Sequence, residues 1–201
     1  TGHSEGERLG ACTDCRRFWA KFRAAEIDKA GIEKIESRLV TTSGTCAVMG
    51  TASTMACITE TLGMALPGTA AIPAIHADRL RAAEASGAQA VHLAQIDRDK
   101  QLTPKKIITP ASVENALRIL LAVGGSTNAI IHLTAIAGRL GIPIPLQQLN
   151  KLSDETPVLI DLKPTGDHYM EDLFKAGGLG VVLRELKPLL NLECLSVTGE
   201  T

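Results

Sequence analysis

The sequence predicts a helix-rich α/β fold with few strands. Two segments with apolar stripes and clear ends carry the prediction, one opening at Thr109-Pro110 and one following Gly124-Gly125. The best strand candidate is the apolar run at residues 157–161, which ends in an acid. With 201 residues, 45% of them apolar, the chain can bury a core, because a globule of this size buries roughly 70% of its unfolded surface.

The composition excludes several classes of function. A net charge of -1 and 2% aromatic residues argue against a nucleic-acid partner, which needs a basic surplus or stacking platforms. Five cysteines are too few for a disulfide scaffold, so we expect a reduced, cytoplasmic setting. The charge-poor stretch at residues 39–77 is interrupted by threonines and ends at Pro67-Gly68, so we expect no membrane association.

In the first quarter of the chain, residues 11–30 predict a helix with Phe18 and Phe22 on one face. A polar hinge is expected at 31–42. A helix is then expected over about 47–64, and because Glu60 is its only charge, this helix should be buried. A buried carboxylate needs a partner, so Glu60 could pair with an arginine such as Arg79 or Arg81, which is a structural role, or it could face a site. The structural role is the stronger interpretation.

The middle of the chain predicts a helix over about 77–86, with Gly87 as its C-terminal stop. Residues 90–93 fit a strand or a helix end. Residues 100–108 predict an exposed loop.

The second half gives the clearest helices. Thr109-Pro110 supplies a capping hydroxyl and a first-turn proline, and the helix carries an apolar stripe up to Gly124-Gly125. The next helix should end at Gly141, and two helices joined by so short a turn form an antiparallel pair. Short helices are expected at 168–176 and 179–186.

Cys46 is the first candidate for chemistry. It follows Ser43-Gly44-Thr45 and precedes the predicted helix at 47–64. Backbone N–H groups and the helix dipole at such a position favour a thiolate, which can act as a nucleophile or a metal ligand. From the residue type alone, an inert buried cysteine is the stronger interpretation.

The turn Gly124-Gly125-Ser126-Thr127-Asn128 is the second candidate. A flexible turn into a helix N-terminus can bind a carboxylate or phosphate, so Ser126, Thr127 and Asn128 are candidate substrate or anion ligands. The same residues could equally be an ordinary turn that ends one helix and caps the next. A third motif, Cys12-x-x-Cys15, lacks the second pair that a zinc site needs.

Several blocks together resemble the dihydroxy-acid and sugar-acid (aldonate) dehydratase family. The blocks occur in the family's order, and the resemblance covers nearly all of the chain. They are Ser43-Gly44-Thr45-Cys46-Ala47-Val48-Met49-Gly50-Thr51-Ala52-Ser53-Thr54-Met55, Glu60-Thr61-Leu62-Gly63-Met64-Ala65-Leu66-Pro67-Gly68, Glu114-Asn115-Ala116, Gly124-Gly125-Ser126-Thr127-Asn128-Ala129, His132-Leu133, Asp161-Leu162-Lys163-Pro164-Thr165-Gly166, Ala176-Gly177-Gly178 and Val197-Thr198-Gly199. The version at Gly50-Thr51-Ala52-Ser53-Thr54 looks more like the sugar-acid branch.

The resemblance implies an iron–sulfur hydro-lyase. In this family three cysteines hold a [2Fe–2S] cluster, with [4Fe–4S] as the alternative, and a Mg²⁺ ion lies nearby. Cys46 matches the third cluster cysteine and is therefore the implied metal and cofactor ligand. The implied reaction removes water from a sugar acid or a 2,3-dihydroxy acid and yields a 2-keto-3-deoxy acid.

The chain also departs from the family pattern. The Cys-Asp-Lys block and the first cluster cysteine have no counterpart here, and the proposed serine base would follow Thr201. We therefore expect residues 1–201 to be a single fragment of the N-terminal domain, without the upstream cluster and Mg²⁺ segment or the C-terminal domain. It should contain no catalytic base and be inactive alone.

Other functions stay open at this point. One alternative is the dihydroxy-acid dehydratase of branched-chain amino-acid biosynthesis. Others are a small enzyme that uses Cys46 with the turn at Ser126, and a non-catalytic interaction module derived from the fold. For the complete enzyme the resemblance implies a small-molecule acid as partner and a homodimer or homotetramer.

Overall fold

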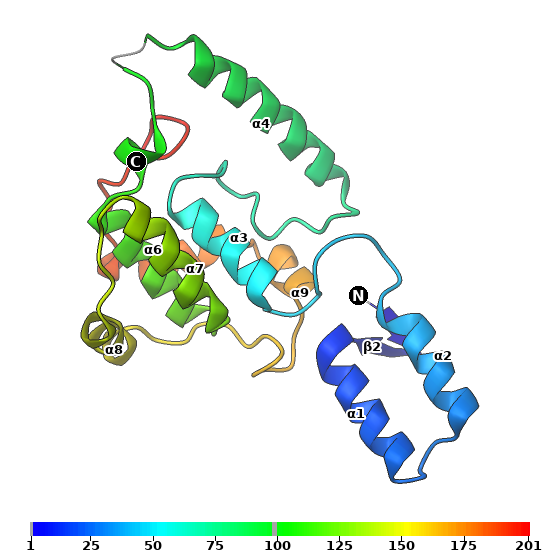
Figure 1. Ribbon diagram of the computed structural model, residues 1–201. Coiled ribbons are helices and arrows are strands. Elements are labelled where there is room, and N and C mark those ends of the chain that lie inside the picture. Colours follow the sequence, from blue (N-terminus) through cyan, green and yellow to red (C-terminus); the bar gives the residue numbers. More distant parts are fainter. Residues whose placement is uncertain (1, 98–99) are drawn as a thin grey trace.

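The structure is a computed structural model that describes residues 2–97 and 100–201. Over these residues the fold is a set of helices with one small strand pair (Figure 1). The predicted helix-rich class with few strands is confirmed. In order, the elements are β1 (Gly2–Ser4), β2 (Glu7–Leu9), α1 (Ala11–Arg23), α2 (Lys29–Leu39), α3 (Thr51–Thr61), α4 (Ala77–Gln95), α5 (Pro104–Ile107), α6 (Pro110–Ala122), α7 (Asn128–Arg139), α8 (Leu146–Glu155), α9 (Met170–Lys175), α10 (Leu179–Leu186) and a 3-10 turn at Lys187–Leu189.

Helix α6 is the centre of the molecule and is buried on two faces. One face packs with α3, α7 and α8, where Leu117 and Leu120 of α6 share a core with Leu133 of α7. The other face packs against α9 and α10 through Ile119 and Ala122. Because no side of α6 meets water along most of its length, this helix fixes the relative positions of its neighbours.

The predicted ends of α6 are confirmed. The Thr109 side chain accepts a hydrogen bond from Ser112 N (3.2 Å), and Thr109 N donates in return to Ser112 Oγ (2.9 Å). This reciprocal pair satisfies two N–H groups that the helix leaves without intrahelical partners. After Gly124-Gly125 the chain enters α7, which contacts α6 as the second helix of the predicted pair.

Strands β1 and β2 form an antiparallel ribbon in which Gly2 is opposite Leu9. With α1 and α2 they make up the end of the molecule farthest from α6 and α7 in Figure 1. The predicted helix at 11–30 is too long, because α1 ends at Arg23 and Ala25 takes a φ of 59°. The hinge predicted at 31–42 is wrong, since α2 occupies it and is capped by Asp28, whose carboxylate accepts from Gly31 N (2.7 Å).

The strand predicted at 157–161 is wrong. The segment is extended but is paired with no strand in the described part of the chain; one backbone bond, from Leu159 N to Ala122 O (2.8 Å), holds it on α6. Val158 is 70% exposed. An apolar run of this length needs a ladder partner to become a strand, and nothing in the local sequence supplies one.

Three other expectations in the middle of the chain also change. Helix α4 continues through Gly87 to Gln95, so residues 90–93 are helical. The loop expected at 100–108 includes α5, whose Ile107 is 1% exposed, while residues 98–99 lie outside the described part of the chain. Helix α8 was not predicted.

Within the described residues, no helix combines the length and apolar character that crossing a bilayer requires.

Candidate functional site

Cys46 lies in a loop before α3, not at the first turn of a helix. The helix expected from residue 47 begins at Thr51, with Gly50 as its N-cap. The dipole and backbone N–H groups invoked for Cys46 therefore belong to residues several positions later, and the electrostatic part of that prediction is wrong. The reason is that Ala47 and Met49 make backbone hydrogen bonds to the segment at residues 163–170 in place of helical ones.

Two backbone hydrogen bonds fix this loop to a segment far along the chain. Met49 N donates to Lys163 O and Met170 N donates to Ala47 O, both at 2.8 Å. From inside α3, the buried Ser53 hydroxyl donates to Val48 O (3.1 Å). Cys46 is thus held between these contacts, and Ser53 is a positioning residue that the sequence pattern alone did not single out.

Cys46 forms part of the wall of a cavity of about 810 Å³. Cys46 is half-buried and is one of the residues that line that cavity. The lining residues come from β1, the 42–47 loop, α3, the 65–76 segment, the start of α4 and the start of α9. Those with polar or sulfur-bearing side chains are His3, Thr42, Ser43, Thr45, Cys46, Ser53, Thr59, Thr69, His76, Arg79, Met170 and Glu171. Cys46 is therefore not the buried cysteine that its residue type alone favours.

The Ser126–Asn128 turn is bound to the first turn of α3. Thr54 Oγ1 accepts from Ser126 N (3.0 Å), and the hydroxyls of Thr51 and Ser126 lie 2.8 Å apart. Asn128 Nδ2 donates to Thr51 Oγ1 (3.2 Å). Thr127 is exposed and is the N-cap residue of α7, without a side-chain capping bond.

The two predicted sites are therefore separate but share a helix. The turn residues are not in the wall of the Cys46 cavity, whereas Ala52 and Ser53, next to Thr51 on α3, are. The N-terminal ends of α3 and α7 meet where Thr51, Ser126 and Asn128 are hydrogen-bonded.

The remaining cysteines have different surroundings. Cys12 is exposed and Cys15 is half-buried, both on α1. Burial raises the pKa of the Cys57 thiol to about 12, and burial also raises that of Cys194. Among the described residues, no group of three His, Cys, Asp or Glu side chains is placed to hold a metal ion. Any metal centre at Cys46 would need ligands from beyond these residues.

Glu60 has the structural role that its lone charge indicated, but with unexpected partners. Its carboxylate accepts from Gly68 N (2.8 Å) and Ala70 N (2.7 Å), and so orders the 67–70 loop at the cavity. Among the described residues neither Arg79 nor Arg81, the partners considered from the sequence, forms an ion pair with Glu60. Backbone amides satisfy the buried carboxylate in their place, as burial of a charge requires.

A buried polar cluster around Asp14 escaped prediction. The Asp14 carboxylate accepts from Gly10 N (2.5 Å) and lies 3.0 Å from Arg17 and 3.7 Å from Lys163. Lys163 also donates to the Tyr169 hydroxyl (3.0 Å), a contact that raises the pKa of Lys163. The cluster joins α1 to the segment that holds the Cys46 loop. The sequence did not reveal it because Asp14 lies inside Cys12-x-x-Cys15 and has no motif of its own.

A second ion pair binds the strand ribbon to α9. Arg8 donates two hydrogen bonds to the Asp172 carboxylate, each at 2.8 Å. The hydrogen bonds from Arg8 lower the pKa of Asp172 to about 2. Together with the Asp14 cluster, this pair connects the end of the molecule that holds α1 and α2 to the wall of the cavity.

Comparison with known proteins gives the same family as the motifs. The family model described as dihydroxy-acid/6-phosphogluconate dehydratase N-terminal matches residues 2–201. A dihydroxy-acid dehydratase of Thermodesulfovibrio yellowstonii is 40% identical over 92% of this chain and 33% of its own length. One of Caldanaerobacter subterraneus subsp. tengcongensis is 42% identical over 90% of this chain and 32% of its own length.

A relative with a different name matches the entire chain. The 6-deoxy-6-sulfo-D-gluconate dehydratase of Pseudomonas putida is 40% identical over 100% of this chain and 34% of its own length. The chain thus spans about a third of the length of the curated relatives it matches. With the family model matching from residue 2 to residue 201, the chain belongs to the dihydroxy-acid/6-phosphogluconate dehydratase family and corresponds to its N-terminal part.

Proposed function

We propose that this chain is part of a hydro-lyase that removes water from a sugar acid and releases a 2-keto-3-deoxy acid. The observation that carries the proposal is the position of Cys46, half-buried in the wall of a cavity of about 810 Å³, in a loop fixed by backbone bonds to residues 163 and 170. Membership of a family whose named relatives are dehydratases supports the reaction type.

The donor set fits one position of an iron–sulfur cluster. An accessible thiol is the ligand such clusters require, and Cys46 would supply it. The other ligands, and those of a Mg²⁺ ion, would come from outside the described residues. When bound, a [2Fe–2S] cluster, or [4Fe–4S] as the alternative, would act with Mg²⁺ as a Lewis acid that assists loss of the 3-hydroxyl.

The reaction itself is an elimination. The C2–H and C3–O bonds break, a C2–C3 double bond forms, and the resulting enol takes a proton at C3 to become the ketone. The residues of this chain do not supply the base in our proposal. They hold the Cys46 loop through Ser53 and Met49, and they shape the cavity in which the acid binds.

We further propose that Ser126, Thr127 and Asn128 contribute to substrate or anion binding. The turn lies where the N-termini of α3 and α7 meet, and both ends carry partial positive charge. Thr127 is exposed there, and the Asn128 amide and Ser126 hydroxyl are ordered by Thr51. For the complete enzyme we propose a cytoplasmic homodimer or homotetramer.

A second candidate substrate is the 2,3-dihydroxy acid of branched-chain amino-acid biosynthesis. Relatives named dihydroxy-acid dehydratase are 40% and 42% identical to this chain, close to the 40% of the sulfogluconate enzyme. Both substrates undergo the same elimination. Assays of the full-length enzyme with aldonates and with 2,3-dihydroxy-3-methylbutanoate, read as 2-keto acid formation, decide between them.

The ligand assignment is tested by Cys46→Ser in the full-length enzyme, with Cys12→Ser as the matched control because Cys12 is exposed on α1. We expect Cys46→Ser to lose visible cluster absorbance, iron content and activity together, while Cys12→Ser keeps all three. A Cys46→Ser enzyme that retains activity and a normal spectrum would refute the assignment. Absence of 2-keto acid formation from every acid tested would refute the proposed reaction.

A further inference from the structure

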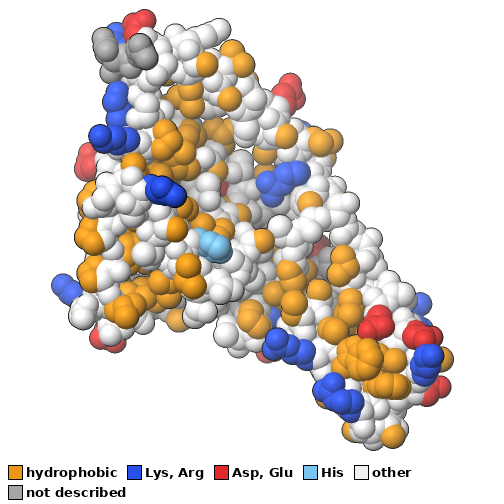
Figure 2. All heavy atoms as spheres, in the orientation of Figure 1, with side chains coloured by type: hydrophobic (Ala, Val, Ile, Leu, Met, Phe, Trp, Pro, Cys, Tyr) orange, Lys and Arg blue, Asp and Glu red, His pale blue; other side chains and the backbone are white. Residues whose placement is uncertain are grey.

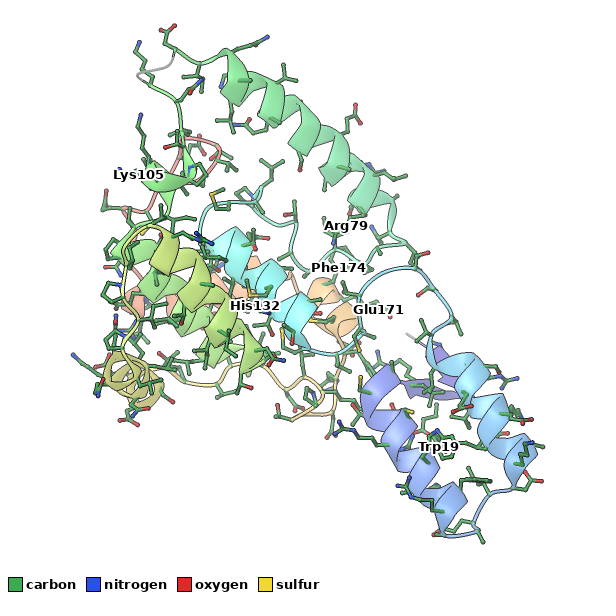
Figure 3. All side chains as sticks on the ribbon, in the orientation of Figure 1. Trp19, Arg79, Lys105, His132, Glu171 and Phe174 are labelled. Carbon is green, nitrogen blue, oxygen red and sulfur yellow. The ribbon has the colours of Figure 1, made fainter. Side chains whose placement is uncertain are left out.

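The Cys46 cavity contains one basic side chain that the motifs did not bring into the argument. Arg79, in the first turn of α4, is the only Lys or Arg among the described residues of its wall. Figure 3 labels Arg79 between the start of α4 and α9, where Phe174 and Glu171 also lie. Figure 2 shows a blue group in the hollow at that place.

The Arg79 guanidinium is anchored but not neutralised. Its Nη2 donates to the carbonyl oxygen of Ile72, which fixes the group beside the 65–76 segment. Within residues 2–97 and 100–201, no carboxylate forms an ion pair with it. A guanidinium has five N–H donors, so the bond to Ile72 leaves most of its donor capacity for other acceptors.

The acidic groups closest in sequence and in the cavity are already paired. Glu171 is in the cavity wall but forms an ion pair with Lys175 at 2.7 Å. Asp78, next to Arg79, forms an ion pair with Arg81, and its backbone N–H donates to His76 Nδ1 (3.2 Å). The His76 ring in turn packs edge-on against Phe174, with centroids 4.9 Å apart. Arg79 thus carries a positive charge in the cavity wall that no carboxylate of the described residues neutralises.

We infer that Arg79 binds the carboxylate of the acid substrate. This inference rests on the proposed function, which brings an acid into the cavity that Cys46 and Arg79 share. The planar fork of a guanidinium matches the two oxygens of a carboxylate. A carboxylate can accept from this fork while its remaining lone pairs face a cation, so the assignment is compatible with a nearby Mg²⁺.

The competing explanation is that Arg79 only holds the 65–76 segment through the Ile72 carbonyl. The two roles differ in their dependence on substrate charge. A carboxylate ligand weakens binding of the acid when removed and leaves binding of the uncharged amide nearly unchanged. A residue that only orders the segment affects both compounds alike.

The experiment uses the full-length enzyme with Arg79→Gln, Arg79→Lys and Arg81→Gln, the last as a matched control because Arg81 is exposed on the same helix. The probes are the acid that wild type dehydrates fastest and its carboxamide, or D-gluconate and D-gluconamide if none is dehydrated. Affinities are measured by calorimetry, KM and kcat by turnover, and the cluster by its visible spectrum.

We expect Arg79→Gln to weaken binding of the acid by about 10- to 100-fold, the range for a hydrogen bond to a charged group, and binding of the amide by less than twofold. Arg79→Lys should recover part of the loss, and Arg81→Gln should match wild type. Spectra should be unchanged throughout. Equal weakening of acid and amide, unchanged binding of the acid, or wild type that binds acid and amide alike would each overturn the inference.

The two proposals fail in different ways. An enzyme that binds the acid through Arg79 but forms no 2-keto acid contradicts the proposed reaction and keeps the inference. An active enzyme whose Arg79→Gln variant binds the acid normally contradicts the inference and keeps the reaction.

Discussion

Gly125 lies where α6, α3 and the Ser126 turn come together, and we predict that Gly125→Ala destabilises the protein. A Cβ at this position would lie 2.7 Å from Thr54 Cγ2 and 2.8 Å from Leu120 Cδ1. Both neighbours are fixed: Leu120 is 4% exposed, and Thr54 is 0% exposed. The Thr54 hydroxyl donates to Gly50 O (2.8 Å) and accepts from Ser126 N (3.0 Å).

The magnitude follows from these contacts. Forcing an extra carbon into a packed core costs about 1–3 kcal/mol, and moving Thr54 away would also strain its bond to Ser126, worth about 1 kcal/mol. We expect the free energy of unfolding to fall by about 2–3 kcal/mol. For a unit of this size each kcal/mol shifts Tm by about 2–4 °C, so Tm should fall by about 4–12 °C.

The matched control is Gly138→Ala on the exposed side of α7, where an added Cβ meets nothing within 4 Å. Alanine is favoured over glycine in a helix by up to about 1 kcal/mol, so this variant should be as stable as wild type or more so. Thermal unfolding followed by circular dichroism measures both. A Gly125→Ala protein as stable as the Gly138→Ala protein would refute the steric argument.

Three further predictions concern the cavity and its supports. Glu60→Gln should lower the free energy of unfolding by about 1–3 kcal/mol, because the nitrogen of the new amide cannot accept the hydrogen bond that Gly68 N or Ala70 N donates to the carboxylate. Glu33→Gln, at an exposed position, should leave the free energy of unfolding unchanged. Chemical denaturation of the two variants and wild type measures the difference. The Arg8–Asp172 pair should stabilise the protein above pH 4 and lose its contribution as pH falls toward 2, so wild type and Arg8→Gln should converge in stability there. The 201-residue chain alone should form no 2-keto acid and hold no cluster.

Each of these has a contrary result. Equal stability of the Glu60 and Glu33 variants would remove the capping role. A stability difference between wild type and Arg8→Gln that is the same at pH 2 and pH 6 would show that charge is not its source. Turnover of an aldonate by the isolated chain would show that its residues include a complete catalytic site.

The sequence predicts best where the signal is local. The ends of α6 follow from Thr109, Pro110 and the Gly124-Gly125 pair, because caps and turns depend on residues close to one another in the chain. The bounds of α10, Leu179–Leu186, also agree with the helix predicted at 179–186. The structural role of Glu60 follows from the cost of burying an unpaired charge, although the choice of backbone amides as its partners does not.

Prediction from the sequence fails where contacts between distant segments determine the local structure. Residues 157–161 have the composition of a strand, but a strand needs a neighbour that composition does not provide. The start of α3 moves from residue 47 to Thr51 because the preceding loop bonds to residues 163 and 170. Cys46 and Arg79 share a cavity only after α4 and α9 are placed, so no spacing in the sequence connects them.

The backbone bonds from Met49 to Lys163 and from Met170 to Ala47 also set an order of events during synthesis. Cys46 leaves the ribosome roughly 120 residues before the segment that fixes its loop, a delay of about 6–25 s at 5–20 residues per second. During that interval the thiol is on an unanchored nascent segment. The Cys46 loop can therefore reach its folded geometry only after the segment at residues 163–170 has also left the ribosome.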